Sequence, residues 1–321
     1  MKPFLKNYFW RLLVSLLLLL FLIRFVNPKE FAHLLRNLSL PYLIGYFALI
    51  FVDRLIMAYK WKILLDAKGV HSSLMELIVV YFKGTFIGNL LPTSLGGDAV
   101  RAYELSKNAK TVVDVISSII MERFLGFISS ALMAILVIPL LYLFITGFPR
   151  VLLLILTLFL FAGVSPLFLI MQREGRASAL TKFLGKLPWA DKISKISSSF
   201  VLYRNHPRAL VKFFIWSFGE QLVPILATFL LALSLGLFIP FYYLIPIIPI
   251  TQFFARIPIS LSGLGIQEGL FITIFALIGI GTTSAFTLGF ASNLGNILSG
   301  LPGAYFYLKG SPSHEPKPDN H

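Results

Sequence analysis

The chain has 321 residues, of which 57% are hydrophobic and only 13% are charged. This composition is typical of a polytopic membrane protein and excludes a sizeable soluble domain. The absence of cysteine excludes disulfide bonds, thiolate catalysis and cysteine-ligated metal sites. The formal net charge is +14, and in a membrane protein such an excess indicates cytoplasmic loops and contact with anionic lipids before it indicates nucleic acid.

The first two apolar segments predict two spans. Residues 12–26 follow Lys2, Lys6 and Arg11 and resemble a signal peptide, but no small-residue cleavage site follows them, so we interpret them as a retained span. The preceding basic residues place the N-terminus on the cytoplasmic side. We expect a loop over 27–40 outside and a second span over 41–59, which returns the chain to the cytoplasm.

The next apolar segment, 74–91, ends in a helix break. Residues 91–98 read Leu-Pro-Thr-Ser-Leu-Gly-Gly-Asp, and a helix cannot continue through Pro and Gly without a cost. Residues 98–110 are too polar to span and carry basic side chains, so this segment should return to the same face. We therefore expect a re-entrant hairpin, with Asp98 capping its second helix.

The middle of the chain predicts three more crossings. A span over 111–144 contains Glu122 and Arg123, which are stable at that depth only if they face protein or a cavity. Residues 151–171 return to the cytoplasm. The basic segment 172–212 then forms either an amphipathic helix on the membrane surface or a solvated linker helix. Residues 210–237 cross outward.

The remaining segments complete an all-α fold. Residues 241–281 break at 257–265, which read Ile-Pro-Ile-Ser-Leu-Ser-Gly-Leu-Gly, and a last span covers 284–308. The tail, 310–321, should be disordered. We predict one transmembrane domain, 1–309, with about six full spans and two broken or re-entrant hairpins. Its halves, about 1–150 and 151–309, should form an inverted repeat with both termini cytoplasmic in the cell membrane.

The two breaks share a motif at a constant offset. Pro92, Ser94, Leu95 and Gly97 recur as Pro258, Ser260, Leu261 and Gly263. A matched pair of Pro/Gly-interrupted apolar segments, one in each half, is typical of a transporter's substrate site. The alternative is a pair of interfacial turns, which are alike because Pro, Ser and Gly are common in turns.

The residues around the breaks predict an anion site. Each break exposes a helix N-terminus, and Arg101, Arg123 and Arg256 lie on or near the breaks, where a guanidinium can hold a phosphate. The predicted substrate-binding residues are Pro92, Ser94, Gly96, Gly97, Asp98, Arg101, Glu122, Arg123, Glu220, Arg256, Pro258, Ser260, Gly263, Gly265 and Glu268. The alternative is that these charged side chains only neutralise one another. The sequence shows no catalytic, metal or cofactor motif, so we expect no enzyme and no cofactor.

Three of these stretches resemble the lysylphosphatidylglycerol synthase transmembrane-domain family, also called flippase-like or UPF0104. They are 88–101, 122–126 and 258–269, and the resemblance covers essentially 1–309. Ser262 replaces a common Gly, and Gln267 replaces an Arg that often precedes the Glu.

The resemblance implies a stand-alone lipid translocase without the aminoacyl-transfer domain of two-part members. Family members are tied to moving aminoacylated phospholipids or glycosylated lipid carriers. The expected partners are a membrane lipid substrate and anionic lipids at the cytoplasmic surface, with no nucleic acid. The alternative is an integral enzyme or an accessory lipid-binding subunit of a glycolipid or cell-envelope lipid pathway.

Overall fold

The computed structural model describes residues 2–90, 96–106, 112–144, 203, 206–255, 260 and 263–309, and this part of the chain is helical with no strand. Its helices are α1 (Lys2–Ile23), α2 (Pro28–Arg36), α3 (Leu40–Asp66), α4 (Leu74–Leu90), α5 (Gly96–Ser106), α6 (Val112–Phe144), α10 (Pro207–Glu220), α11 (Leu222–Ser234), α12 (Phe241–Ala255), α13 (Ile266–Ala276), α14 (Thr282–Leu298) and α15 (Leu301–Leu308). The prediction of an all-α polytopic membrane protein is confirmed.

Three helical stretches are long and apolar enough to cross a membrane. They are α3, the part of α6 from Val112 to Leu140, and the stretch Pro207–Ser234, which contains α10 and α11. Residues 9–23 of α1 qualify together with α2 across a bend of 100°. The predicted span over 151–171 and most of the basic segment 172–212 lie outside the described residues.

Two predicted segments differ from the structure. The expected loop over 27–40 contains α2, because Pro28 presets the first turn and the Asn27 side chain accepts a hydrogen bond from the Lys29 amide at 3.0 Å. The expected last span over 284–308 is divided between α14 and α15. The division falls just before Pro302, whose missing amide favours the start of a helix over its interior.

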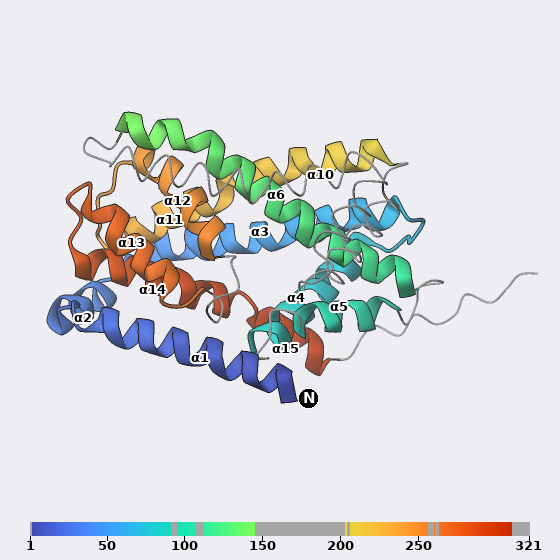
Figure 1. Cartoon of the computed structure of the whole chain (residues 1–321), viewed down its shortest axis with the longest axis horizontal. Helices are drawn as coiled ribbons and strands as arrows, with labels where there is room; N and C mark the ends of the chain where they lie inside the picture. Colours follow the sequence, from blue (N-terminus) through green and yellow to red (C-terminus); the bar gives the residue numbers. More distant parts are fainter. Residues whose placement is uncertain are drawn as a thin grey trace, which may run out of the picture.

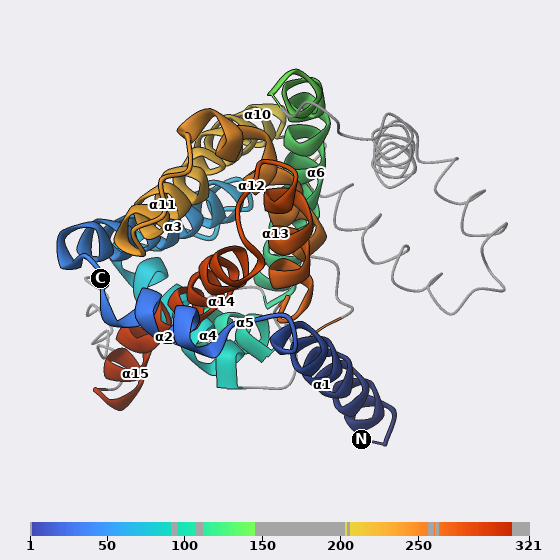
Figure 2. The ribbon, with the colours of Figure 1, turned by 90° about the vertical axis from the view of Figure 1, so that its left-hand side faces the viewer.

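Helix α3 packs against α4, α6, α10 and α11. Helix α12 packs on α6, and α13 packs on α14. Helix α1 lies at the edge, as Figure 2 shows, and contacts α13. The outward side chains of α1 include Leu16, Leu20 and Phe21, each more than half exposed. An apolar exposed face of this kind suits contact with lipid.

The two ends of the bundle can be named by the ends of α3. At the Ser39 end, the Ser39 amide bonds the Ser234 carbonyl at the end of α11 at 2.8 Å. There the Asn27 amide also bonds Thr283 at the start of α14 at 3.0 Å. At the Asp66 end, the Tyr203 hydroxyl donates to the Leu64 carbonyl at 3.0 Å, beside the start of α10. In Figure 1, α3 runs along the bundle from one of these ends to the other.

The hairpins α4–α5 and α12–α13 begin at opposite ends of the bundle. Helix α4 follows the Asp66 end of α3, and α5 runs back toward that end (Figure 1). Helix α12 follows the Ser39 end of α11, and α13 leads back to the start of α14 at the same end. This is the arrangement that an inverted repeat of two broken hairpins requires.

The first hairpin is held together by a glycine seam, which consists of Gly84, Gly88 and Gly97. A Cβ atom at Gly84 would lie 2.8 Å from the Gly97 carbonyl oxygen, and one at Gly88 would lie 3.2 Å from the Gly97 Cα. A Cβ atom at Gly97 would collide with the Gly84 carbonyl oxygen. Small residues four apart on α4 therefore let α5 approach at backbone distance, as small residues do between membrane helices.

Candidate functional site

A polar cavity of about 360 Å³ lies in the middle of the bundle, and we call it the central cavity. Its charged lining residues are Asp53, Arg54 and Glu220. Its carboxamide lining residues are Asn89, Gln221, Gln252, Gln267, Asn293 and Asn296. A concave site with several polar groups in a protein whose outer surface is apolar can hold a polar ligand or head group.

Residues that flank both helix breaks line this cavity. Asn89 lies in the last turn of α4, immediately before the first break. Ala255 is the last residue of α12, before the second break, and Leu264 and Gln267 follow that break. The two hairpins begin at opposite ends of the bundle, and described residues beside both breaks line the same cavity. Interrupted backbone at membrane depth is tolerated where it lines such a cavity.

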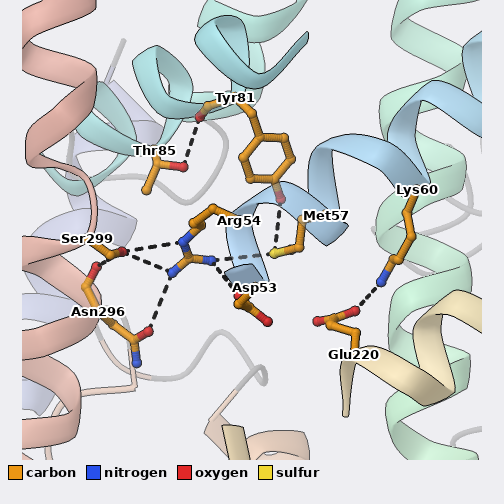
Figure 3. A network of polar contacts seen from close by, with 9 residues as sticks. All are labelled: Asp53, Arg54, Met57, Lys60, Tyr81, Thr85, Glu220, Asn296 and Ser299. Carbon is orange, nitrogen blue, oxygen red and sulfur yellow. Dashed lines mark hydrogen bonds and ion pairs between the residues drawn. The ribbon is translucent and has the colours of Figure 1, made fainter. Parts of the chain in front are cut away.

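Arg54 on α3 is a cation in the cavity wall, and its polar contacts are long. Its guanidinium nitrogens lie 3.2 Å from the Ser299 hydroxyl, 3.4 Å from the Asn296 side-chain oxygen and 3.4 Å from Asp53. Figure 3 shows the guanidinium directed toward α14 between these groups. Short charge-assisted bonds measure about 2.7–2.9 Å. The contacts of Arg54 are thus longer than such bonds and join α3 to the end of α14.

Lys60 and Glu220 form a buried ion pair at the edge of the same cavity (Figure 3). Both side chains are less than a tenth exposed, and the Phe213 ring lies 5.0 Å from the Lys60 ammonium. Glu220 ends α10 because Pro224 lacks the amide that would bond its carbonyl in a continuous helix. The ion pair thus joins α3 to the junction of α10 and α11.

Glu268 fixes the start of the second hairpin's return helix. Its carboxylate accepts a hydrogen bond from the Gly265 amide at 2.7 Å and another from the Asn293 side chain at 2.8 Å. Gly263 and Gly265 adopt φ values of 78° and 84°, which a residue with a side chain rarely adopts. Glu268 is fully buried, so it acts here as a link between α13 and α14.

The charged residues after the first break form a separate network, which we call the Arg101 cluster. Arg101 pairs with Glu122 and lies 3.5 Å from Asp98, and Asp98 also pairs with Arg123. The Trp61 and Tyr81 rings lie 4.1 and 4.4 Å from the Arg101 guanidinium. None of the four charged residues lines the central cavity. Their two positive and two negative charges instead pair with one another. Asp98 lies in the first turn of α5, which begins at Gly96, and the expectation that it caps this helix is wrong.

The other predicted site residues are placed as follows. Gly96 and Gly97 open α5 at the glycine seam, and Ser260 is buried between the two parts of the second hairpin. Pro92, Ser94, Arg256 and Pro258 lie outside the described residues. In the part of the chain that the structure describes, no three His, Asp or Glu side chains gather in a way that could hold a metal ion.

Comparison with known proteins identifies the family. The family described as "Lysylphosphatidylglycerol synthase TM region" matches residues 8–300. The chain belongs to this family. It is similar to a UPF0104 membrane protein of Methanocaldococcus jannaschii, with 24% identity over 286 residues and 84% of each chain covered. It is also similar to a UPF0104 membrane protein of Methanothermobacter thermautotrophicus, with 25% identity over 325 residues and 92% of each chain covered.

The region shared with the lysylphosphatidylglycerol synthase transmembrane family contains both breaks and the whole central cavity. Our candidate set from the sequence did not include Arg54, Lys60, Asn293 and Asn296, which line the cavity or adjoin it. The signal that could have found them is an ionisable or amide side chain within an apolar span. Asn293 and Asn296 are three residues apart and share one face of α14, but only the fold shows that this face meets Arg54 on α3.

Proposed function

We propose that this protein moves an anionic or phosphate-bearing membrane lipid between the two leaflets. The observation that supports this most strongly is that residues flanking both helix breaks line one polar cavity. The head group would pass through the cavity, where it finds hydrogen-bond partners. The acyl chains would stay in the bilayer along the apolar outer face. Either a phospholipid or a glycosylated lipid carrier fits this chemistry.

The opposite entry of the two hairpins suits alternating access. If α4–α5 opens, the cavity is reached from the Asp66 end, and if α12–α13 opens, it is reached from the Ser39 end. Arg54 is the residue that we assign to the phosphate, because its present contacts are 3.2 Å or longer and a guanidinium can hold a phosphate through two donors. The carboxamides around it would bind the remaining polar groups.

The distribution of basic residues supports an orientation. Lys62, Arg208 and Lys212 lie at the Asp66 end of the bundle, and basic residues gather on the cytoplasmic side of membrane proteins. We infer that the Asp66 end faces the cytoplasm in the cell membrane, with both termini on that side. We also propose that the protein is a transporter rather than an enzyme, and that it works without a cofactor.

The test is leaflet exchange in vesicles. The purified chain is reconstituted with fluorescent phosphatidylglycerol or phosphatidylcholine, and the outer-leaflet dye is reduced chemically to follow exchange. We expect faster exchange than in protein-free vesicles, and we expect Arg54→Gln to slow it roughly tenfold or more, because a hydrogen bond to a charged group is lost.

Arg36→Gln is the matched control, since Arg36 carries the same charge on the exposed helix α2 away from the cavity. It should leave exchange unchanged. Exchange no faster than in protein-free vesicles for any lipid would contradict transport and favour a subunit that only binds lipid.

A further inference from the structure

A second cavity, of about 610 Å³, lies between α3 and α10 at the Asp66 end of the bundle. The charged side chains in its lining are mostly basic. Lys62, Arg208 and Lys212 contribute three cations, beside His206 and the single carboxylate of Asp66. Asp66 already accepts a hydrogen bond from Lys62 at 3.0 Å. Asp66 therefore balances the charge of Lys62, and the described residues of the cavity lining include no other carboxylate to balance Arg208 and Lys212.

Arg208 and Lys212 are exposed and make no ion pair within the described part of the chain. They lie one turn apart on the same face of α10. Helix α10 begins at Pro207, which also lines the cavity, so the positive end of the helix dipole adds to both side chains. This combination favours an anion at the mouth of the cavity.

An aromatic and apolar surface continues from this basic mouth. Trp216 follows Lys212 by one more turn, and its ring packs edge-on against Tyr59 of α3 with the ring centroids 4.9 Å apart. Tyr59 lines the cavity. Trp216 is 42% exposed, and the neighbouring side chains of Val211 and Ile215 are more than half exposed. The basic mouth therefore suits the anionic head group of a phospholipid, and the apolar strip beside it suits an acyl chain.

We propose that the groove formed by Tyr59, Lys62, Arg208, Lys212 and Trp216 binds an anionic phospholipid. The phosphate lies between Arg208 and Lys212, and an acyl chain lies against Trp216 and Ile215. Basic pockets between membrane helices bind anionic lipid head groups in this way. The site does not depend on transport through the central cavity, and its test measures binding alone.

The experiment is a lipid titration of the full-length purified chain, followed by native mass spectrometry. Phosphatidylglycerol and phosphatidylcholine with identical acyl chains are compared, and all variants are also made in an Arg54→Gln background, where the central cavity has lost its cation. The test variant is Arg208→Gln with Lys212→Gln. The control is Lys29→Gln with Arg36→Gln, which removes the same charge from a cavity beside α2 at the Ser39 end.

We expect the wild type to bind phosphatidylglycerol more tightly than phosphatidylcholine. The test pair should weaken phosphatidylglycerol binding roughly tenfold or more and leave phosphatidylcholine binding unchanged. The control pair should change neither. Equal affinity for the two lipids, or equal losses in the test and control pairs, would show that binding follows overall charge and would overturn the site.

Two further measurements, with Trp216→Ala and with inorganic phosphate as competitor, distinguish a lipid-binding site from a site for a free anion. We expect Trp216→Ala to weaken phosphatidylglycerol binding, and we expect millimolar phosphate to displace it only in part. Full displacement by phosphate, together with no effect of Trp216→Ala, would identify a free-anion site and contradict the lipid assignment.

Discussion

Lys60 on α3 and Glu220 at the end of α10 are paired in the interior of the bundle, where each is the nearest charge of opposite sign to the other. Two ions without water are stable only as a pair, because each has lost its hydration. The pair therefore fixes the position of the α10–α11 junction relative to α3. The central cavity depends on that position, since residues on both sides of the junction line it.

Removing one partner of this pair should destabilise the fold strongly. We expect Glu220→Gln to lower the free energy of unfolding by about 3–5 kcal/mol, because Lys60 is left buried and uncompensated. Lys60→Met combined with Glu220→Gln should recover most of the loss. The measurement is the melting temperature of the purified protein, with the exposed Glu30→Gln as control. A double variant no more stable than Glu220→Gln alone would contradict this role.

Arg101 and Arg54 should respond differently to the same substitution. Arg101→Gln leaves Glu122 buried without its partner, so we expect a large fall in melting temperature that Glu122→Gln in the same chain relieves. Arg54→Gln should change the melting temperature little, because its polar contacts are 3.2 Å or longer and its side chain borders the polar central cavity. The reverse result, with Arg54 needed for stability and Arg101 for leaflet exchange, would show that the Arg101 cluster, and not Arg54, binds the anion.

The glycine seam predicts a steric effect on the first hairpin. In Gly97→Ala the new methyl group meets the Gly84 carbonyl oxygen, so α4 and α5 must separate. We expect a cost of about 1–3 kcal/mol, as for other overpacked sites. Gly219→Ala is the control, because no atom lies within 4 Å of a Cβ there. Equal melting temperatures for the two variants would show that the hairpin does not depend on this approach.

Single cysteines test the orientation of the bundle. The chain has no cysteine, so Ser73→Cys and Phe238→Cys each carry one label site. Ser73 precedes α4 at the Asp66 end, and Phe238 lies between α11 and α12 at the Ser39 end with 86% of its surface exposed. An impermeant maleimide should label Ser73→Cys only from the cytoplasm and Phe238→Cys only from outside. Labelling of both from one side would contradict the opposite entry of the hairpins.

The helices could be predicted from the sequence because apolar length and Pro/Gly interruptions are local signals. The segment 74–91 corresponds to α4, and 111–144 corresponds to α6. Helix α2 was missed because it is short and amphipathic, and none of its residues is buried. The break between α14 and α15 was missed because a single Gly-x-Pro in an apolar run also occurs in kinked but continuous spans.

The candidate site was harder to predict than the fold. Two breaks with one motif indicated a shared site, and residues flanking both breaks line the central cavity. The same reasoning selected the charges closest to the breaks in sequence. Arg101 is closer to a break in sequence than Arg54, but α5 turns it away toward Glu122 on α6. The partner of a buried charge depends on which helices pack together, and sequence distance does not report this.

The short helix α15 couples the end of the chain to the first hairpin. Its Gly303 meets the backbone of Phe82 on α4 so closely that a Cβ atom has no room, and α15 and α4 should therefore move as one body. Ser299, directly before α15, contacts Arg54 in the central cavity. Ser299 and Gly300 thus have the position of a pivot. An anion that draws Arg54 away from Ser299 would loosen this pivot and free the joined body of α4 and α15 to tilt. In the transport cycle that we propose, substrate binding at Arg54 would in this way free the hairpin α4–α5 to open at the Asp66 end.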